Sequence, residues 1–151
     1  MHVRVFGGAA LILTCLAAAA CDESLSDIAG PTPNLTPTFS SIQHEIFETT
    51  DPSGRQACVT CHFVAPGRLT PGGLNLTAGN SYAALVNARS ILRAGAIRVV
   101  PGDPENSYLI HKLEGRPGIF GVRMPATQGP FLTDGQIRII KRWIENGAPN
   151  D

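Results

Sequence analysis

The chain of 151 residues has no excess of either charge, because 12 Lys and Arg side chains balance 12 Asp and Glu side chains. Nucleic acid is therefore not an expected partner, and no acidic block indicates a disordered tail. No internal repeat and no convincing strand alternation are visible, which disfavours repeat proteins and β-rich folds. The four cysteines form two pairs, and the roles assigned to them below leave none for a disulfide.

The apolar run at the N-terminus, residues 5–20, is too short to span a bilayer comfortably, which takes about 20 residues. It follows the positive Arg4, as the apolar region of a secretory signal peptide does, so we expect such a peptide over 1–20. The segment Ala18–Ala20 before Cys21 resembles a bacterial lipobox, which predicts that Cys21 is lipidated and becomes the mature N-terminus. Ordinary signal cleavage near the alanines is the alternative. In both cases the mature chain is expected on the periplasmic side of a bacterial membrane, lipid-anchored in the first case and secreted in the second.

Residues 21–39 contain few large apolar side chains and three prolines, so we interpret them as a lipidated N-terminus followed by a tether. The domain is expected over 40–151. There, 3.6-residue periodicity and frequent Gly and Pro predict short helices with long loops, which is an all-α fold.

Local signals predict four helices in this domain. They are expected over 41–49, from Asn80 or Ser81 onward, from Asp103-Pro104 to Gly115, and from Thr133 to Gly147. The last is the clearest, because Thr133 and Gln136 form a capping box and a stripe of Ile137, Ile140, Trp143 and Ile144 follows.

The segment Cys58-Val59-Thr60-Cys61-His62 carries the chemistry. Two thiols three residues apart lie on one side of a helical turn, where both can form thioethers to one haem. His62, directly after the second thiol, is then placed as the proximal ligand of the iron. CxxCH is the attachment signature of haem c, and composition alone would give roughly 0.003 matches in this chain. We therefore predict one covalent haem c.

Two other interpretations of the two cysteines are weaker. A thioredoxin-like CxxC needs a βαβ context, which the sequence does not offer. A zinc site needs two more closely spaced ligands, whereas the remaining histidines of the domain, His44 and His111, lie far apart in the sequence.

Met124 is the candidate for the distal ligand of the iron. It is the only methionine after the signal peptide and lies in a Gly/Pro loop, where Pro125 would stiffen the chain. His/Met ligation raises the reduction potential. The alternatives are His111 as a second imidazole ligand, an open distal site, and a methionine that only fills the core.

Four further residues, a proline and three arginines, are candidates for supporting roles at the haem. A proximal histidine usually donates its second ring N–H to a carbonyl or carboxylate, and Pro66 is the expected acceptor. Arg89, Arg93 and Arg98 would neutralise haem propionates or form a docking patch, or they are solvated surface charges.

With these motifs, residues 40–151 resemble the class I mono-haem cytochrome c domains of bacterial secreted and lipid-anchored proteins, including planctomycete-type ones. The resemblance is carried by CVTCH (58–62), PGGLNL (71–76), VVPGDPENSYLIHKL (100–113), RMP (123–125) and WIENGAP (143–149). It implies a cytochrome c-like fold wrapped around one haem, with Met124 as distal ligand and Phe47 packed near Trp143. The long 63–79 loop and the absence of a basic face depart from short mitochondrial-type cytochromes.

These inferences predict a single-electron carrier, not an enzyme, whose partners are redox proteins outside the cytoplasm and, through a lipid, the membrane. Two alternatives remain: a haem enzyme or sensor with an open or displaceable distal site, and an accessory module of one dehydrogenase.

Overall fold

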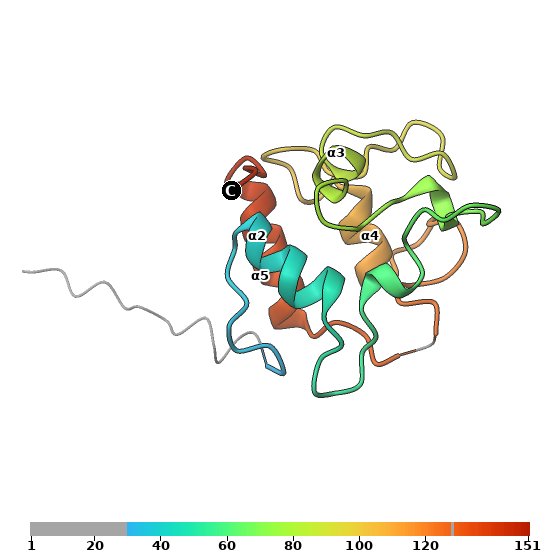
Figure 1. The fold of residues 1–151 in the computed structure, drawn as a ribbon. Helices are drawn as coiled ribbons and strands as arrows, with labels where there is room; N and C mark the ends of the chain where they lie inside the picture. The colour runs from blue at the N-terminus through green and yellow to red at the C-terminus, as the bar shows by residue number, and fades with distance from the viewer. Residues whose placement is uncertain (1–29, 128) are drawn as a thin grey trace, which may run out of the picture.

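The computed structural model describes residues 30–127 and 129–151, which form short helices joined by long loops (Figure 1). Within these ranges there is no β-strand, in agreement with the expected all-α class; the predicted signal peptide and Cys21 lie outside them. None of the described helices is long and apolar enough to cross a membrane. The elements are α2 (Phe39–Ile42), η1 (Gln43–Glu48), η2 (Cys58–Thr60), η3 (Pro71–Gly73), α3 (Ser81–Leu85), α4 (Tyr108–Glu114) and α5 (Asp134–Glu145).

Helix α2 continues directly into the π-helix η1, where the sequence predicts a single helix over 41–49. The helix begins earlier than predicted because Thr38, not Ser40, is its N-cap. Thr38 is extended, and its Oγ1 accepts a hydrogen bond from the Ser41 amide at 3.3 Å. The apolar face of this helical segment is buried and consists of Ile42, Ile46 and Phe47.

The packed region also begins before residue 40, the boundary expected from the sequence. Leu35 is fully buried and Phe39 nearly so, and both belong to the main hydrophobic core. The side-chain amide of Gln136 donates to Oγ1 of Thr32 at 3.0 Å. Residues 32–39 are therefore part of the domain, since two large apolar side chains suffice to hold this proline-rich segment against it.

Helix α5 has the start that the sequence predicts. Thr133 and Gln136 form the reciprocal capping box, with both hydrogen bonds present. The helix ends at Glu145, before Gly147, which has a positive φ of 92°. Its core-facing residues are Gln136, Ile137, Ile139, Ile140, Trp143 and Ile144.

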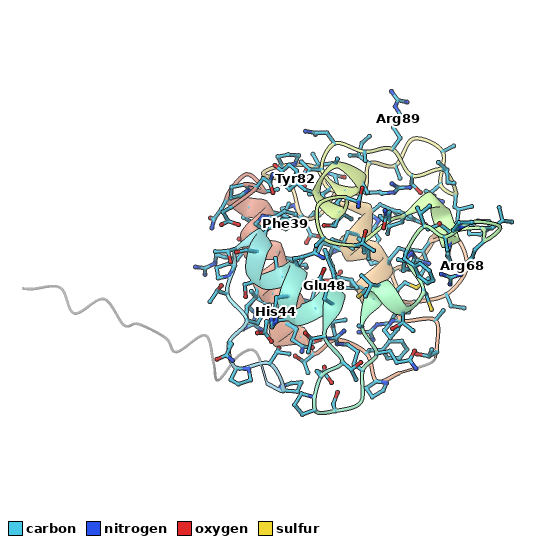
Figure 2. The ribbon with its side chains drawn as sticks, viewed as in Figure 1. Phe39, His44, Glu48, Arg68, Tyr82 and Arg89 are labelled. Atoms are coloured by element: carbon cyan, nitrogen blue, oxygen red, sulfur yellow. The ribbon has the colours of Figure 1, made fainter. Side chains whose placement is uncertain are left out.

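Aromatic rings join the N-terminal helical segment to α5. The Phe39 ring centroid lies 5.4 Å from that of Trp143 and 5.1 Å from that of Tyr82. Helix α2 therefore packs against α5, and Figure 1 shows the two helices crossing. Figure 2 shows Phe39 and Tyr82 close together. Phe47 packs its ring against Phe39 at 6.5 Å. The ring contact with Trp143 is made by Phe39, and Phe47 belongs to the same hydrophobic core as Trp143.

Helix α4 begins at Tyr108, four residues after the predicted start. Asp103 caps a turn instead, because its Oδ1 accepts from the Asn106 amide at 3.1 Å while Ser107 donates to the Pro104 carbonyl at 3.2 Å. The predicted end is confirmed: Gly115 is the left-handed C-cap, with φ of 73°. The predicted start of α3 at Asn80 or Ser81 is also confirmed.

Candidate functional site

The CVTCH segment forms one tight helical turn. The amides of Cys61 and His62 both donate to the Cys58 carbonyl, at 3.2 and 2.9 Å. Residues three and four apart in such a turn lie on the same side of it. Both thiols are free; Cys58 is half-buried and Cys61 is exposed. The turn therefore brings the three predicted site residues together with both sulfurs available for bonding.

The imidazole of His62 is held in an apolar setting. Burial lowers its pKa, the backbone of Leu74 and Pro71 partly counteracts this, and the charges of Arg98 and Arg68 lower it further. The ring is therefore neutral at pH 7. Its Nδ1 is buried yet has no hydrogen-bond partner among the described residues, a condition that is costly unless another group binds the ring.

The backbone that faces this ring belongs to the turn at 71–74 and not to Pro66, the expected acceptor, which is exposed. The amide of Leu76 donates to the His62 carbonyl at 2.8 Å, which ties this turn to the CVTCH segment. The position of Pro66 close to His62 in the sequence led to the wrong acceptor, because a long loop returns and brings residues 71–74 to the ring. The PGGLNL segment (71–76) is the sequence feature that could have indicated this contact.

The Cys58 thiol differs from a redox-active CxxC thiol. Burial raises its pKa to about 11, although the charge of Arg55 acts in the opposite direction. Its Sγ donates to the Ile46 carbonyl at 3.3 Å. Exchange-active cysteines have lowered pKa values and exist partly as thiolates at neutral pH. The Cys58 environment therefore disfavours both disulfide exchange and the thiolate that zinc requires.

A buried ion pair, Arg55 with Asp51, anchors the chain just before the CVTCH turn. Both side chains are 1% exposed, and Arg55 Nε lies 3.0 Å from Asp51 Oδ2. The remaining guanidinium nitrogens donate to carbonyls at the end of η1 and in the following turn, at Glu45, Ile46, Thr49 and Gln56. The Ile46 carbonyl thus accepts from both Arg55 and Cys58. Sequence reasoning missed this pair, although its i,i+4 spacing is visible.

Met124 lies at the end of a loop that returns along α4. Its side chain is half-buried and packs against the same core that Cys58 and Val59 touch. Its amide donates to the Lys112 carbonyl at 2.9 Å. Met124 and the CVTCH turn therefore border one common core, although they are more than 60 residues apart in the chain.

His111, the alternative ligand, is engaged elsewhere. One ring nitrogen, Nε2, lies 2.6 Å from the Glu105 carbonyl oxygen. The ring packs edge-on to Tyr108, with centroids 6.1 Å apart. These contacts hold the His111 ring to the turn before α4 and to Tyr108, and they make Met124 the better candidate for a ligand.

Three loops with exposed apolar side chains border this end of the molecule; we call them the apolar rim. Among the described residues, the exposed large apolar side chains all lie on it: Val64, Leu69, Ile91, Leu92, Phe120 and Val122. A Cβ added at Gly73 would lie 3.0 Å from Ile91, so the turn behind His62 touches the second loop. A cavity of about 350 Å³ separates residues 92–94 of the second loop from residues 118–120 of the third. Exposed apolar side chains on neighbouring loops are a feature of ligand and partner sites.

The three arginines of the 89–98 segment have different surroundings. Arg98 donates to the carbonyls of Ala84 and Gly72, both at 2.8 Å, so it fixes the loops. Arg93 lies beside Gly118 at the cavity. Arg89 extends away from the body of the molecule in Figure 2, as a solvated charge does. Arg93 is thus the one placed to meet an anionic group in the cavity.

No three His, Cys, Asp or Glu side chains gather into a metal-ion site in the part of the chain that the structure describes. The chain matches no protein-family model, no curated protein and no solved structure.

Proposed function

We propose that the chain is an electron-transfer protein of cytochrome c-like fold that holds one covalent haem c. The observation that carries this proposal is the CVTCH turn, in which two free thiols and a neutral imidazole lie within five residues. The buried Nδ1 of His62 has no partner among the described residues and lies beside the backbone of residues 71–74, where a histidine that ligates iron would find the acceptor it usually uses for its second ring nitrogen. The apolar rim supports the proposal, because a porphyrin needs such side chains around it.

Each residue has one task in this proposal. Cys58 and Cys61 would hold the haem through thioethers, and His62 and Met124 would ligate its iron. The haem, when bound, supplies an iron that cycles between Fe(III) and Fe(II). His62 is neutral because burial lowers its pKa, and the Met124 thioether carries no proton, so neither ligand has to lose a proton at neutral pH to bind. With His62 and Met124 both ligating the iron, no position would remain for a substrate, and the chain would transfer electrons without catalysing a reaction.

The proposed place of action is the periplasmic side of a bacterial membrane, where Cys21 carries the lipid anchor and redox proteins are the partners. This rests on the 1–20 signal pattern and on the known requirement that haem c be attached outside the cytoplasm. A haem enzyme or sensor with a displaceable Met124, and an accessory module of one dehydrogenase, are the alternatives to a free carrier.

Expression together with a haem c maturation system tests the proposal. A pyridine haemochrome spectrum of the denatured, acid-acetone-washed protein is expected to give one haem per chain. Intact mass spectrometry should show the mass of the chain plus one haem. Haem that washes out, or its absence in a folded protein, would contradict covalent attachment.

Replacing Met124 with Ala tests the distal ligand. The wild type in its oxidised form is expected to show the red charge-transfer band of a Met–Fe(III) bond, and M124A is expected to lack it. Cyanide association should accelerate by on the order of 10- to 100-fold in M124A, because the closed wild-type site binds only through its minor open population.

The matched control is T127A, which shortens an exposed side chain three residues after Met124 that lies outside the apolar rim. It should retain the band and the slow cyanide reaction. An oxidised wild type that has no band and binds cyanide rapidly would favour the enzyme or sensor alternative.

A further inference from the structure

The 118–124 loop that ends in Met124 has few apolar anchors of its own. Phe120 is 57% exposed and Val122 is 59% exposed. Gly118 and Gly121 are both exposed and have positive φ values of 79° and 69°. Without buried side chains, the position of such a loop depends on hydrogen bonds to the elements beside it. Those elements decide where the Met124 sulfur lies.

Lys112 of α4 contacts this loop at every second residue from 120 to 124. Its Nζ donates to the Phe120 carbonyl at 2.8 Å and to the Val122 carbonyl at 2.6 Å. Its own carbonyl accepts from the Met124 amide at 2.9 Å. The ammonium and the backbone of a single residue thus fix the last five residues before and including the proposed ligand.

The other contacts of the loop do not duplicate this arrangement. Tyr108 Oη accepts from the Phe120 amide at 2.9 Å, which fixes only the start of the segment. Arg123 Nε donates to the Leu113 carbonyl at 2.6 Å, while its guanidinium stacks on Phe131. Arg123 therefore holds its own side chain to α4 and to the next loop. Lys112 alone bridges two loop carbonyls that have no other partner in the described residues.

The chemistry of Lys112 is unusual for a lysine at the surface of a domain. Lysines near acidic groups form ion pairs, as Lys141 does with Glu105 and Glu114. The ammonium of Lys112 instead meets two neutral carbonyls, and burial lowers its pKa. Hydrogen bonds from a charged donor are stronger than neutral ones. A partly desolvated ammonium that hydrogen-bonds to an exposed loop indicates that the chain requires this loop to be held in one position.

We propose that Lys112 is a positioning residue that holds the 120–124 loop so that Met124 stays on the iron. The inference rests on the proposed function, in which Met124 is the distal ligand. It assigns to Lys112 no contact with the iron or the haem. Without its ammonium the loop opens more often, and Met124 leaves the iron for a larger fraction of the time.

The test compares K112M with K112R and K141M in the haem-loaded protein. Methionine keeps the length and apolar stem of lysine but removes the donors, whereas arginine keeps donors and charge. K141M removes another half-buried lysine, whose ammonium pairs with Glu105 and Glu114 and not with loop carbonyls. The readouts are haem content, the Met–Fe(III) charge-transfer band, the cyanide association rate and the hydrogen exchange of the Phe120 and Met124 amides.

K112M is expected to keep one covalent haem, to lose part of the band, to bind cyanide about tenfold faster and to exchange both amides faster. K112R should restore most of the wild-type values, and K141M should change none of the four. If K112M does not accumulate, K112Q, whose single amide cannot span both carbonyls, takes its place.

A wild-type band together with unchanged cyanide binding in K112M would overturn the role of Lys112 and leave the proposed function intact. Equal effects of K112M and K141M would likewise overturn it, since they indicate a general loss of stability. A haem-loaded wild type without the band would overturn His/Met ligation and, with it, this proposal.

Discussion

Replacing both Cys58 and Cys61 with serine is expected to abolish covalent haem in this chain. Each thioether needs a sulfur nucleophile, and a serine hydroxyl does not replace it. The two thiols are the free cysteines of the described residues and lie in one helical turn with His62. The part of the chain that the structure describes contains no other thiol. Acid-acetone extraction should therefore remove all haem from C58S/C61S, while the wild type retains one equivalent.

The single variants keep this prediction testable if the double variant does not fold. C58S and C61S should each retain haem through one thioether, with the haemochrome band displaced to longer wavelength because one vinyl stays conjugated to the porphyrin. C58S should accumulate less well, because its site is half-buried beside the Ile46 carbonyl, whereas Cys61 is exposed. Haem that resists extraction in the double variant would contradict the proposed attachment.

Local signals in the sequence predicted those parts of the fold that depend on neighbouring residues. The capping box of Thr133 and Gln136 and the left-handed Gly115 are each determined within about four residues, and both were predicted correctly. The CVTCH turn belongs to the same class, since one short segment supplies both sulfurs and the imidazole. Such features require no knowledge of the tertiary structure.

The features that were missed depend on segments that meet only in the folded chain. Asp103-Pro104 is a good helix start by itself, but the Asp103 and Ser107 side chains stabilise a turn that delays α4 to Tyr108. Proline content suggested that residues 32–39 are a tether, whereas burial of Leu35 holds them in the core.

The sequence also could not predict which groups the charged residues contact. Lys112 and Arg55 look like ordinary surface charges in a linear reading, because composition places most Lys and Arg side chains in water. Both instead donate to backbone carbonyls of segments that flank the proposed ligands. Of the candidate site, the turn that gathers Cys58, Cys61 and His62 could be predicted from the motif, but the residues that hold this turn and Met124 in place could not.

Replacing Arg55 with Met is expected to destabilise the haem-loaded protein by about 3–5 kcal/mol, the cost of removing one member of a buried ion pair. The Asp51 carboxylate would remain 1% exposed without its counter-ion. Four carbonyls of η1 and the following turn would lose their donor as well. Thermal unfolding should show a midpoint lower by roughly 10–20 °C.

Two variants separate the contributions to this effect. R55K keeps the charge but lacks the planar fork of five donors, so it should recover only part of the stability. R138M removes an arginine on the exposed side of α5 and is expected to change stability by less than about 0.5 kcal/mol. An R55M protein as stable as R138M would contradict the anchoring role of the pair.

The pH dependence of the R55M effect has a definite sign. Burial alone raises the pKa of Asp51, but hydrogen bonds from Ser53 and Arg55 and the Arg55 charge outweigh it and hold the pKa below its ordinary value. A carboxyl with a lowered folded pKa stabilises the fold above its unfolded pKa, and this contribution is lost as the pH falls through the folded pKa. Removing Arg55 raises the folded pKa of Asp51, so the variant has less of this contribution to lose on acidification.

The difference in unfolding free energy between wild type and R55M should therefore be largest near pH 7 and narrow below about pH 4, near the ordinary pKa of an Asp carboxyl. Guanidinium unfolding at several pH values measures it, and a difference that widens on acidification would show that Asp51 is not the group that Arg55 compensates.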